Sequence, residues 1–134
     1  MKKLITDNNL LSFKDKQYIK KNILSDSLPW YHNEEAVKGD GYWFYSHILI
    51  QRIEHGGGEC SPHSRFFIDL FNKFCEKNNI KYSKIFRCCL NTNFPNEFKS
   101  IAHTDHSFDY KHLLIYLNNF TKGETILLKK DKKT

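Results

Sequence analysis

At 134 residues the chain can hold one domain with a modest core, and it is too short for two. Hydrophobic residues at 40% and aromatic residues at 15% are typical of a globular rather than a disordered chain. No apolar run approaches the roughly 18 residues of a membrane span, and Met1–Asp7 lacks the apolar centre of a signal peptide. We therefore expect a single cytoplasmic domain, without membrane contact, over residues 1–134.

The net charge of +6 would suit a nucleic-acid partner. The positive excess is spread along the chain, however, and part of it lies in four lysines near the end: Lys129, Lys130, Lys132 and Lys133. An ordinary solvated lysine surface has the same composition. The charge therefore leaves a nucleic-acid partner open without favouring it.

The four cysteines form neither a C-x-x-C pair nor the spacing of a zinc site. In a reducing compartment we interpret all of them as small apolar residues of the interior. They are Cys60, Cys75, Cys88 and Cys89. Adjacent side chains on a strand point to opposite faces, so Cys88 and Cys89 are not expected to act together.

Two helices are predicted before residue 80. The first covers about Phe13–Leu24 and opens with a capping box made by Ser12 and Asp15. The second starts at Ser61-Pro62 and ends at Asn78-Asn79. Its apolar residues recur at helical spacing and form a wide face for packing on a sheet: Phe66, Phe67, Leu70, Phe71, Phe74 and Cys75.

Runs of aromatic and β-branched residues predict the strands. The run Tyr42–Ile53 is long and lacks helical periodicity, and Ile85–Asn91 follows the second helix. Two more strands are expected at His112–Asn118 and Thr125–Lys129, joined by a turn at Lys122-Gly123. The pattern indicates an α+β protein in which two helices pack on an antiparallel, barrel-like or sandwich sheet.

Three features of the first half invite a functional interpretation, and for each we favour a structural one. His47 lies inside a predicted strand and is expected to be packed and hydrogen-bonded, and Trp30 is expected to anchor the core. The stretch His55–Glu59 has the glycines of an esterase oxyanion loop. Because the chain has no G-x-S-x-G nucleophile, such a loop would have nothing to stabilise. We interpret it as a mobile loop.

The segment His103-Thr104-Asp105 carries the strongest signal for chemistry. Side chains at i and i+2 of an extended segment share a face, so His103 and Asp105 can turn toward one cation. They would form two thirds of a 2-His-1-carboxylate triad, the ligand set of non-haem iron(II) oxygenases. The pair follows a strand and a loop and precedes the apolar run His112–Asn118.

With these features in this order, the chain resembles the 2-oxoglutarate/iron(II)-dependent dioxygenases. It is most similar to the small prolyl 4-hydroxylase-like members found in phages and microbes. The resemblance runs through a helix opening after Asn8-Asn9-Leu10-Leu11-Ser12, then Pro29-Trp30-Tyr31, Arg87 with Asn91, His103-x-Asp105, Tyr116-Leu117-Asn118 and Gly123-Glu124-Thr125. It implies a partial double-stranded β-helix, or jelly roll, with two supporting helices in the N-terminal half.

The resemblance also implies a reaction, in which oxidative decarboxylation of 2-oxoglutarate is coupled to hydroxylation of a small-molecule or peptidyl substrate. Iron(II) would be held by His103 and Asp105, with O2 as oxidant and ascorbate as an accessory reductant. Tyr116 would meet the distal carboxylate of 2-oxoglutarate. Asn91 could contact the cosubstrate or orient a ligand. No catalytic residue beyond the metal ligands is expected.

The family has a further iron-binding histidine some strands beyond the Gly-Glu-Thr turn, followed by a basic residue for the cosubstrate, and the sequence stops at Thr134 before either. We therefore expect a domain that lacks the strands of the distal ligand, binds iron poorly and turns over little by itself. His106 is expected to face away from His103. His112 is separated from the pair by a loop, and neither histidine is expected to replace the missing ligand.

Two alternatives remain open. The chain could be a non-catalytic jelly-roll remnant or interaction module, and its last strand, with Leu127 and Leu128, would then offer an unpaired edge for self-association. It could also be a basic nucleic-acid-binding module that stacks bases on its aromatic side chains.

Overall fold

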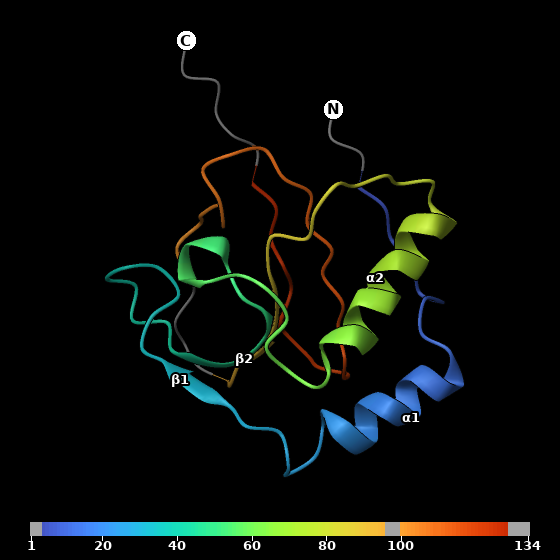
Figure 1. Cartoon of the computed structure of the whole chain (residues 1–134). Helices are drawn as coiled ribbons and strands as arrows, with labels where there is room; N and C mark the ends of the chain where they lie inside the picture. Colours follow the sequence, from blue (N-terminus) through green and yellow to red (C-terminus); the bar gives the residue numbers. More distant parts are fainter. Residues whose placement is uncertain (1–3, 96–99, 129–134) are drawn as a thin grey trace.

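The computed structural model describes residues 4–95 and 100–128. The elements in chain order are α1 (Phe13–Asn22), β1 (Tyr31–Asn33), β2 (Phe44–Ile50), the short 3-10 helix η1 (Ile53–His55), α2 (Ser64–Lys77) and β3 (Cys88–Thr92). The strands form one antiparallel sheet in the order β1-β2-β3. Figure 1 shows the two helices next to each other on one side of the molecule and the sheet on the other. The expected α+β class is confirmed.

Helix α1 begins where the capping box predicts. The Ser12 hydroxyl accepts a hydrogen bond from the Asp15 amide at 3.1 Å, and the Asp15 carboxylate accepts one from the Ser12 amide at 2.9 Å. The helix ends at Asn22, two residues before the expected end, because the amides of Ile23 and Leu24 both donate to the Ile19 carbonyl. This shared acceptor closes the last turn.

Helix α2 begins at Ser64, three residues later than predicted. Residues 61–63 form a turn in which the Ser64 amide donates to the Ser61 carbonyl at 3.1 Å, and the Ser61 amide donates back to the Ser64 hydroxyl at 3.2 Å. The helix packs on α1 through Tyr18, whose ring stacks on Phe66 with centroids 4.0 Å apart. The predicted apolar face is confirmed, because Phe67 and other members of that face are buried.

One cluster of buried side chains joins the helices to the sheet: Ile19, Ile23, Leu28, Leu49, Phe67, Leu70 and Leu90. Leu49 of β2 is 0% exposed. Trp30 packs against this cluster, as expected of a core anchor. None of the helices in the described ranges has the length and hydrophobicity to cross a bilayer.

His47 is a structural residue, which confirms the prediction. Its ring is buried, and its Nδ1–H donates to the Pro29 carbonyl at 2.8 Å, since a carbonyl can only accept. Nε2 is then the acceptor for the Ser61 hydroxyl at 2.7 Å. The imidazole therefore links β2 to the chain before β1 and to the turn before α2.

The glycine loop after η1 uses its amides internally. Gly56 donates to the Ile53 carbonyl at 3.0 Å and Gly57 to the Arg52 carbonyl at 2.9 Å. Three successive glycines have positive φ, where other residues would be strained. These amides are not directed at a substrate, which agrees with the structural interpretation. The expected mobility of the loop stays a prediction.

The strand predictions hold only in part. Tyr42–Ile53 contains the shorter β2, and Ile85–Asn91 overlaps β3. The strands expected at His112–Asn118 and Thr125–Lys129 are wrong for the described residues, which form no ladder there; Lys129 itself lies outside the described residues. The alternation is nevertheless present, because Leu113, Ile115 and Leu117 are half-buried and their neighbours are exposed. An extended segment that packs on the protein with one side shows the same alternation of buried and exposed residues as a paired strand. The alternation in the sequence therefore could not distinguish a lone extended segment from a strand in a sheet.

None of the four cysteines forms a disulfide, and the prediction that all of them lie in the interior is wrong for one. Cys75 is buried and Cys88 and Cys89 are half-buried, but Cys60 is exposed. Burial raises the pKa of Cys88 to about 12 and also raises the pKa of Cys89. Cys60 is exposed because it follows the glycine loop at the surface, a position that cysteine spacing does not reveal.

We expect a thiol reagent at about pH 8 to label Cys60 rapidly and to label Cys88 and Cys89 only when the protein unfolds. The reagent attacks the thiolate, and a raised pKa keeps a thiol protonated at this pH. Mass spectrometry of the labelled protein checks this, with Cys60→Ser as the control that removes the fast reaction. Fast labelling of Cys88 in the folded protein would contradict the assigned burial.

Leu49→Ala should lower the free energy of unfolding by about 2–5 kcal/mol, because it opens a cavity at a fully buried site. Leu114→Ala is the matched control, since Leu114 is 51% exposed, and its effect should be much smaller. Urea denaturation followed by circular dichroism measures both. Equal effects would place Leu49 outside the core.

Candidate metal-binding site

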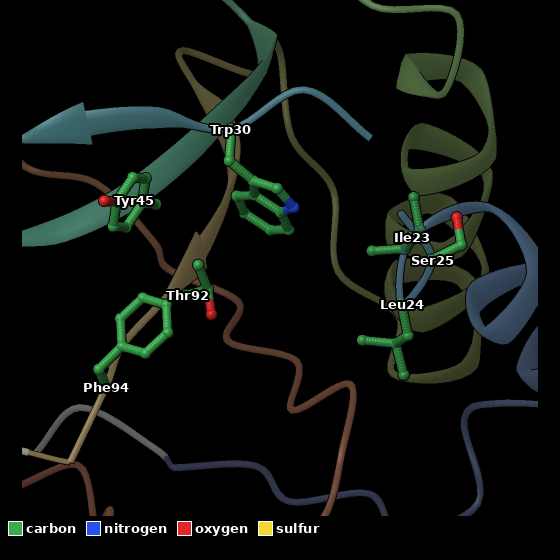
Figure 2. Close-up of a pocket in the computed structure, with 7 residues that line it drawn as sticks. All are labelled: Ile23, Leu24, Ser25, Trp30, Tyr45, Thr92 and Phe94. Atoms are coloured by element: carbon green, nitrogen blue, oxygen red, sulfur yellow. The ribbon is translucent and has the colours of Figure 1, made fainter. Parts of the chain in front are cut away.

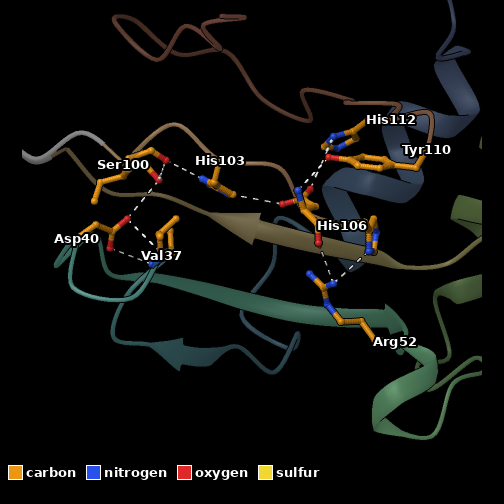
Figure 3. Close-up of polar contacts among 11 residues, drawn as sticks. Val37, Asp40, Arg52, Ser100, His103, His106, Tyr110 and His112 are labelled. Carbon is orange, nitrogen blue, oxygen red and sulfur yellow. Dashed lines mark hydrogen bonds and ion pairs between the residues drawn. The ribbon is translucent and has the colours of Figure 1, made fainter. Parts of the chain in front are cut away.

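Two histidines flank one carboxylate in the segment after residue 100. His103 Nε2 lies 3.6 Å from Asp105 Oδ1, and His112 Nδ1 lies 3.9 Å from Asp105 Oδ2 (Figure 3). The structure therefore brings His103 and Asp105 together, as their spacing predicts. The structure also places His112 beside the other carboxylate oxygen, Oδ2.

A backbone contact orients the ring of His103. Its Nδ1 is 2.7 Å from the carbonyl oxygen of Ile101. A carbonyl only accepts, so Nδ1 carries the proton, and in the neutral ring the Nε2 lone pair faces Asp105. Metal-bound histidines commonly donate their second nitrogen to a carbonyl in this way, which fixes the tautomer that binds metal.

The backbone of Asp105 is held on both sides, while its carboxylate accepts no hydrogen bond from the described residues. The Asp105 amide donates to the Tyr110 hydroxyl at 2.9 Å, and the Asp105 carbonyl accepts from Arg52 Nη1 at 3.2 Å (Figure 3). The Asp105 side chain is 33% exposed. Its negative charge is thus partly removed from water and faces two imidazole nitrogens, both beyond hydrogen-bonding distance.

Arg52, just past the end of β2, is the residue that sequence reasoning missed. Its guanidinium holds the Asp105 carbonyl and also donates to His106 Nδ1 at 3.4 Å. The sequence offers no signal for this role, because 53 positions separate Arg52 from Asp105. At its other end the segment is tied to the chain before β2, where the Ser100 hydroxyl donates to Asp40 at 3.3 Å.

His106 contacts Arg52 and two aromatic rings, and its expected orientation away from His103 stays a prediction. Its ring stacks on Phe108 with centroids 4.8 Å apart and meets the ring of Tyr110 edge-on at 4.8 Å. The loop doubles back and brings His112 Nδ1 to within 3.9 Å of Asp105 Oδ2, and the expectation that His112 does not replace the missing ligand stays a prediction. The hydrogen bond from the Asp105 amide to Tyr110 closes this loop two residues before His112.

Charged groups gather at the β3 face that carries Cys89. Burial raises the pKa of the Cys89 thiol; Asp105 raises it further, while Arg87 and Arg52 lower it. Asn91 lies two residues further along β3 and so shares this face. Asn91 is exposed.

Tyr116 is engaged elsewhere among the described residues. It is half-exposed, its hydroxyl pairs with the Thr125 hydroxyl at 2.7 Å, and its ring packs near Phe120 with centroids 4.9 Å apart. No hydrogen bond or ion pair joins it to described members of the His103 segment. The structure therefore does not bring this predicted cosubstrate contact to the candidate site.

A hollow of about 430 Å³ lies between the end of α1 and the sheet. Figure 2 shows Trp30, Tyr45 and Phe94 around it, opposite Ile23 and Leu24. Ser25 and Thr92 supply its polar groups. The sequence did not predict it, because its walls come from segments that are far apart along the chain.

Over residues 4–95 and 100–128, no three His, Cys, Asp or Glu side chains are already arranged to hold a metal ion. His103 Nε2 and Asp105 Oδ1 are close enough for both to reach one cation. Two atoms that each lie roughly 2.0–2.2 Å from a metal can be up to about 4.4 Å apart. Their 3.6 Å separation is within this limit.

Comparison of the chain with protein-family models, with curated proteins and with solved structures gives no match. The candidate site therefore rests on its own geometry and chemistry.

Arg52→Met should loosen the segment around Asp105 while leaving the core intact. Losing a hydrogen bond to a charged donor costs about 1.5–3 kcal/mol, so the Asp105 amide should exchange with solvent at least about tenfold faster. Hydrogen exchange measured by NMR checks this. The control is Arg65→Met, which removes an exposed ion pair with Glu59. Unchanged exchange in Arg52→Met would show that this contact does not hold the segment.

Proposed function

We propose that this chain is an iron(II)- and 2-oxoglutarate-dependent dioxygenase domain in which His103 and Asp105 hold the iron. The observation that carries the proposal is the orientation of His103. Its Nδ1–H donates a hydrogen bond to the Ile101 carbonyl, and its Nε2 lies 3.6 Å from Oδ1 of Asp105. Imidazole and carboxylate are the donors used by non-haem iron(II) oxygenases.

The charges around the pair support a cation between them. Without a cation or an added proton, the Nε2 lone pair of neutral His103 would face the negative oxygen of Asp105, and neither atom could donate. A divalent cation would be attracted to both. The nearby Arg52 does not neutralise the carboxylate directly, since its hydrogen bond goes to the Asp105 carbonyl.

When bound, iron(II) together with 2-oxoglutarate supplies the oxidising chemistry that hydroxylates an unactivated C–H bond. The chain's own residues would fix the site. Ile101 orients His103, and Arg52 and Tyr110 hold the backbone of Asp105. Such support keeps ligand atoms in place, and its loss typically weakens metal affinity or activity by about 10–100-fold.

The proposed fold is a partial jelly roll, and a three-stranded antiparallel sheet backed by two helices is compatible with one. Asn91 is proposed as a cosubstrate or ligand contact, supported by its position on the Cys89 face of β3. Tyr116 is proposed as a contact for the distal carboxylate of 2-oxoglutarate. To act so, its hydroxyl would have to leave Thr125.

Anaerobic titration of the whole chain with iron(II) and 2-oxoglutarate tests the proposal. We expect the visible charge-transfer band of a chelated keto acid, and His103→Ala should abolish it. His55→Ala is the control, because His55 is an exposed histidine in η1.

A chain that gives no band, or a band that His103→Ala leaves unchanged, would contradict the proposed iron site. A salt-sensitive shift of single-stranded nucleic acid, without any such band, would favour the basic binding module instead.

A further inference from the structure

We infer that His112 is a third metal-ligating side chain, so that His103, Asp105 and His112 form one cation site within residues 103–112. The inference rests on the proposed function only in its use of His103 and Asp105. It changes the expectation for the chain, because a third ligand would come from the same loop rather than from a distant strand.

The distances place both imidazoles within reach of a cation shared with Asp105. His112 Nδ1 is 3.9 Å from Oδ2, and His103 Nε2 is 3.6 Å from Oδ1. Both separations are below the limit of about 4.4 Å for two ligands on opposite sides of one metal, and both exceed the roughly 3.4 Å of a tetrahedral pair, so the side chains would have to close in when a cation binds. The His103 ring faces Oδ1 and the His112 ring faces Oδ2. If Asp105 bound the cation through both oxygens, its carboxylate would lie between the two histidines.

Among the described residues, the Asp105 carboxylate is paired with the imidazoles of His103 and His112, at 3.6 and 3.9 Å. It accepts no hydrogen bond from the described residues, although only 33% of the Asp105 side chain is exposed. The contacts of Tyr110 and Arg52 hold the backbone of Asp105 and limit how far its side chain can move away. A cation shared with the two imidazoles would give this partly buried charge a closer partner than either ring is at 3.6 or 3.9 Å.

His112 can move to complete the site. No preformed group of three ligands exists among the described residues, so a ring must turn when the cation binds. The His112 side chain is 59% exposed, and apart from Asp105 its neighbour in the described part of the chain is the ring of Tyr110, with centroids 6.5 Å apart. Rotation of an exposed side chain between staggered conformations costs little.

The donor set selects the class of cation. Two imidazole nitrogens and one carboxylate suit divalent transition metals such as iron, cobalt, nickel and zinc. Magnesium and calcium prefer oxygen ligands throughout. The cation that we infer is therefore a divalent first-row transition metal. The site would bind it without 2-oxoglutarate.

Titration of the whole chain with cobalt(II), followed by visible absorption, tests the inference. We expect one cobalt per chain, and weaker binding in His112→Ala by at least about tenfold, since loss of even an outer-shell partner costs 10–100-fold. His55→Ala is the matched control for an exposed histidine. Circular dichroism should show His112→Ala folded, because the side chain it removes is exposed.

His112→Cys separates a ligand from a merely structural residue. A thiolate at this position should restore cobalt binding and add a sulfur-to-cobalt charge-transfer band. Binding in His112→Ala that equals the wild type, with loss in His103→Ala, would overturn the role of His112 and leave the proposed iron site standing. Cobalt binding that depends on His112, without a 2-oxoglutarate band, would support the inference and contradict the dioxygenase. No cobalt binding by the wild type would overturn the inference.

Discussion

Strand β2 pairs with β1 on one edge and with β3 on the other, and a bulge interrupts its pairing with β3 between Ile48 and Ile50. Beside the bulge, Ile50 forms an isolated antiparallel bridge with Glu59, and the Leu49 carbonyl faces that segment. That carbonyl accepts from the Ser64 hydroxyl at 2.6 Å and from the Cys60 amide at 3.0 Å. The first residue of α2 is thereby fixed to the middle of the sheet, while the Leu49 side chain fills the core between them.

The candidate site depends on the same strand. Arg52 extends just beyond β2 and reaches the Asp105 carbonyl, so the rigid sheet determines where the His103 segment sits. Aromatic packing holds the far side of that segment, where His106 lies between Phe108 and Tyr110. The proposed ligand atoms lie on a loop, and contacts to the sheet and among the aromatic rings hold that loop in place.

The polar contacts around His47 and those around Asp105 differ in kind. Around His47 every nitrogen has a partner, which is how buried histidines normally stabilise a fold. Around Asp105 the backbone atoms are hydrogen-bonded, while the carboxylate is paired with the imidazoles of His103 and His112 at 3.6 and 3.9 Å, beyond hydrogen-bonding distance. The hydrogen bonds of His47 are therefore accounted for by their role in holding the fold together. The proposed cation site rests on the carboxylate of Asp105, which lies between two imidazoles at these longer distances.

The sequence by itself determined the features that arise from neighbours along the chain. The capping box of Ser12 and Asp15, the apolar face of α2 and the shared side of His103 and Asp105 all follow from local spacing. The tertiary structure alone decided what distant segments do. A period of two could not show that residues 112–118 lack a partner strand, and no pattern could show that Arg52 holds Asp105 or that the loop returns His112 to it. These contacts depend on how the chain closes in space, and loop closure leaves no periodic signal in the sequence.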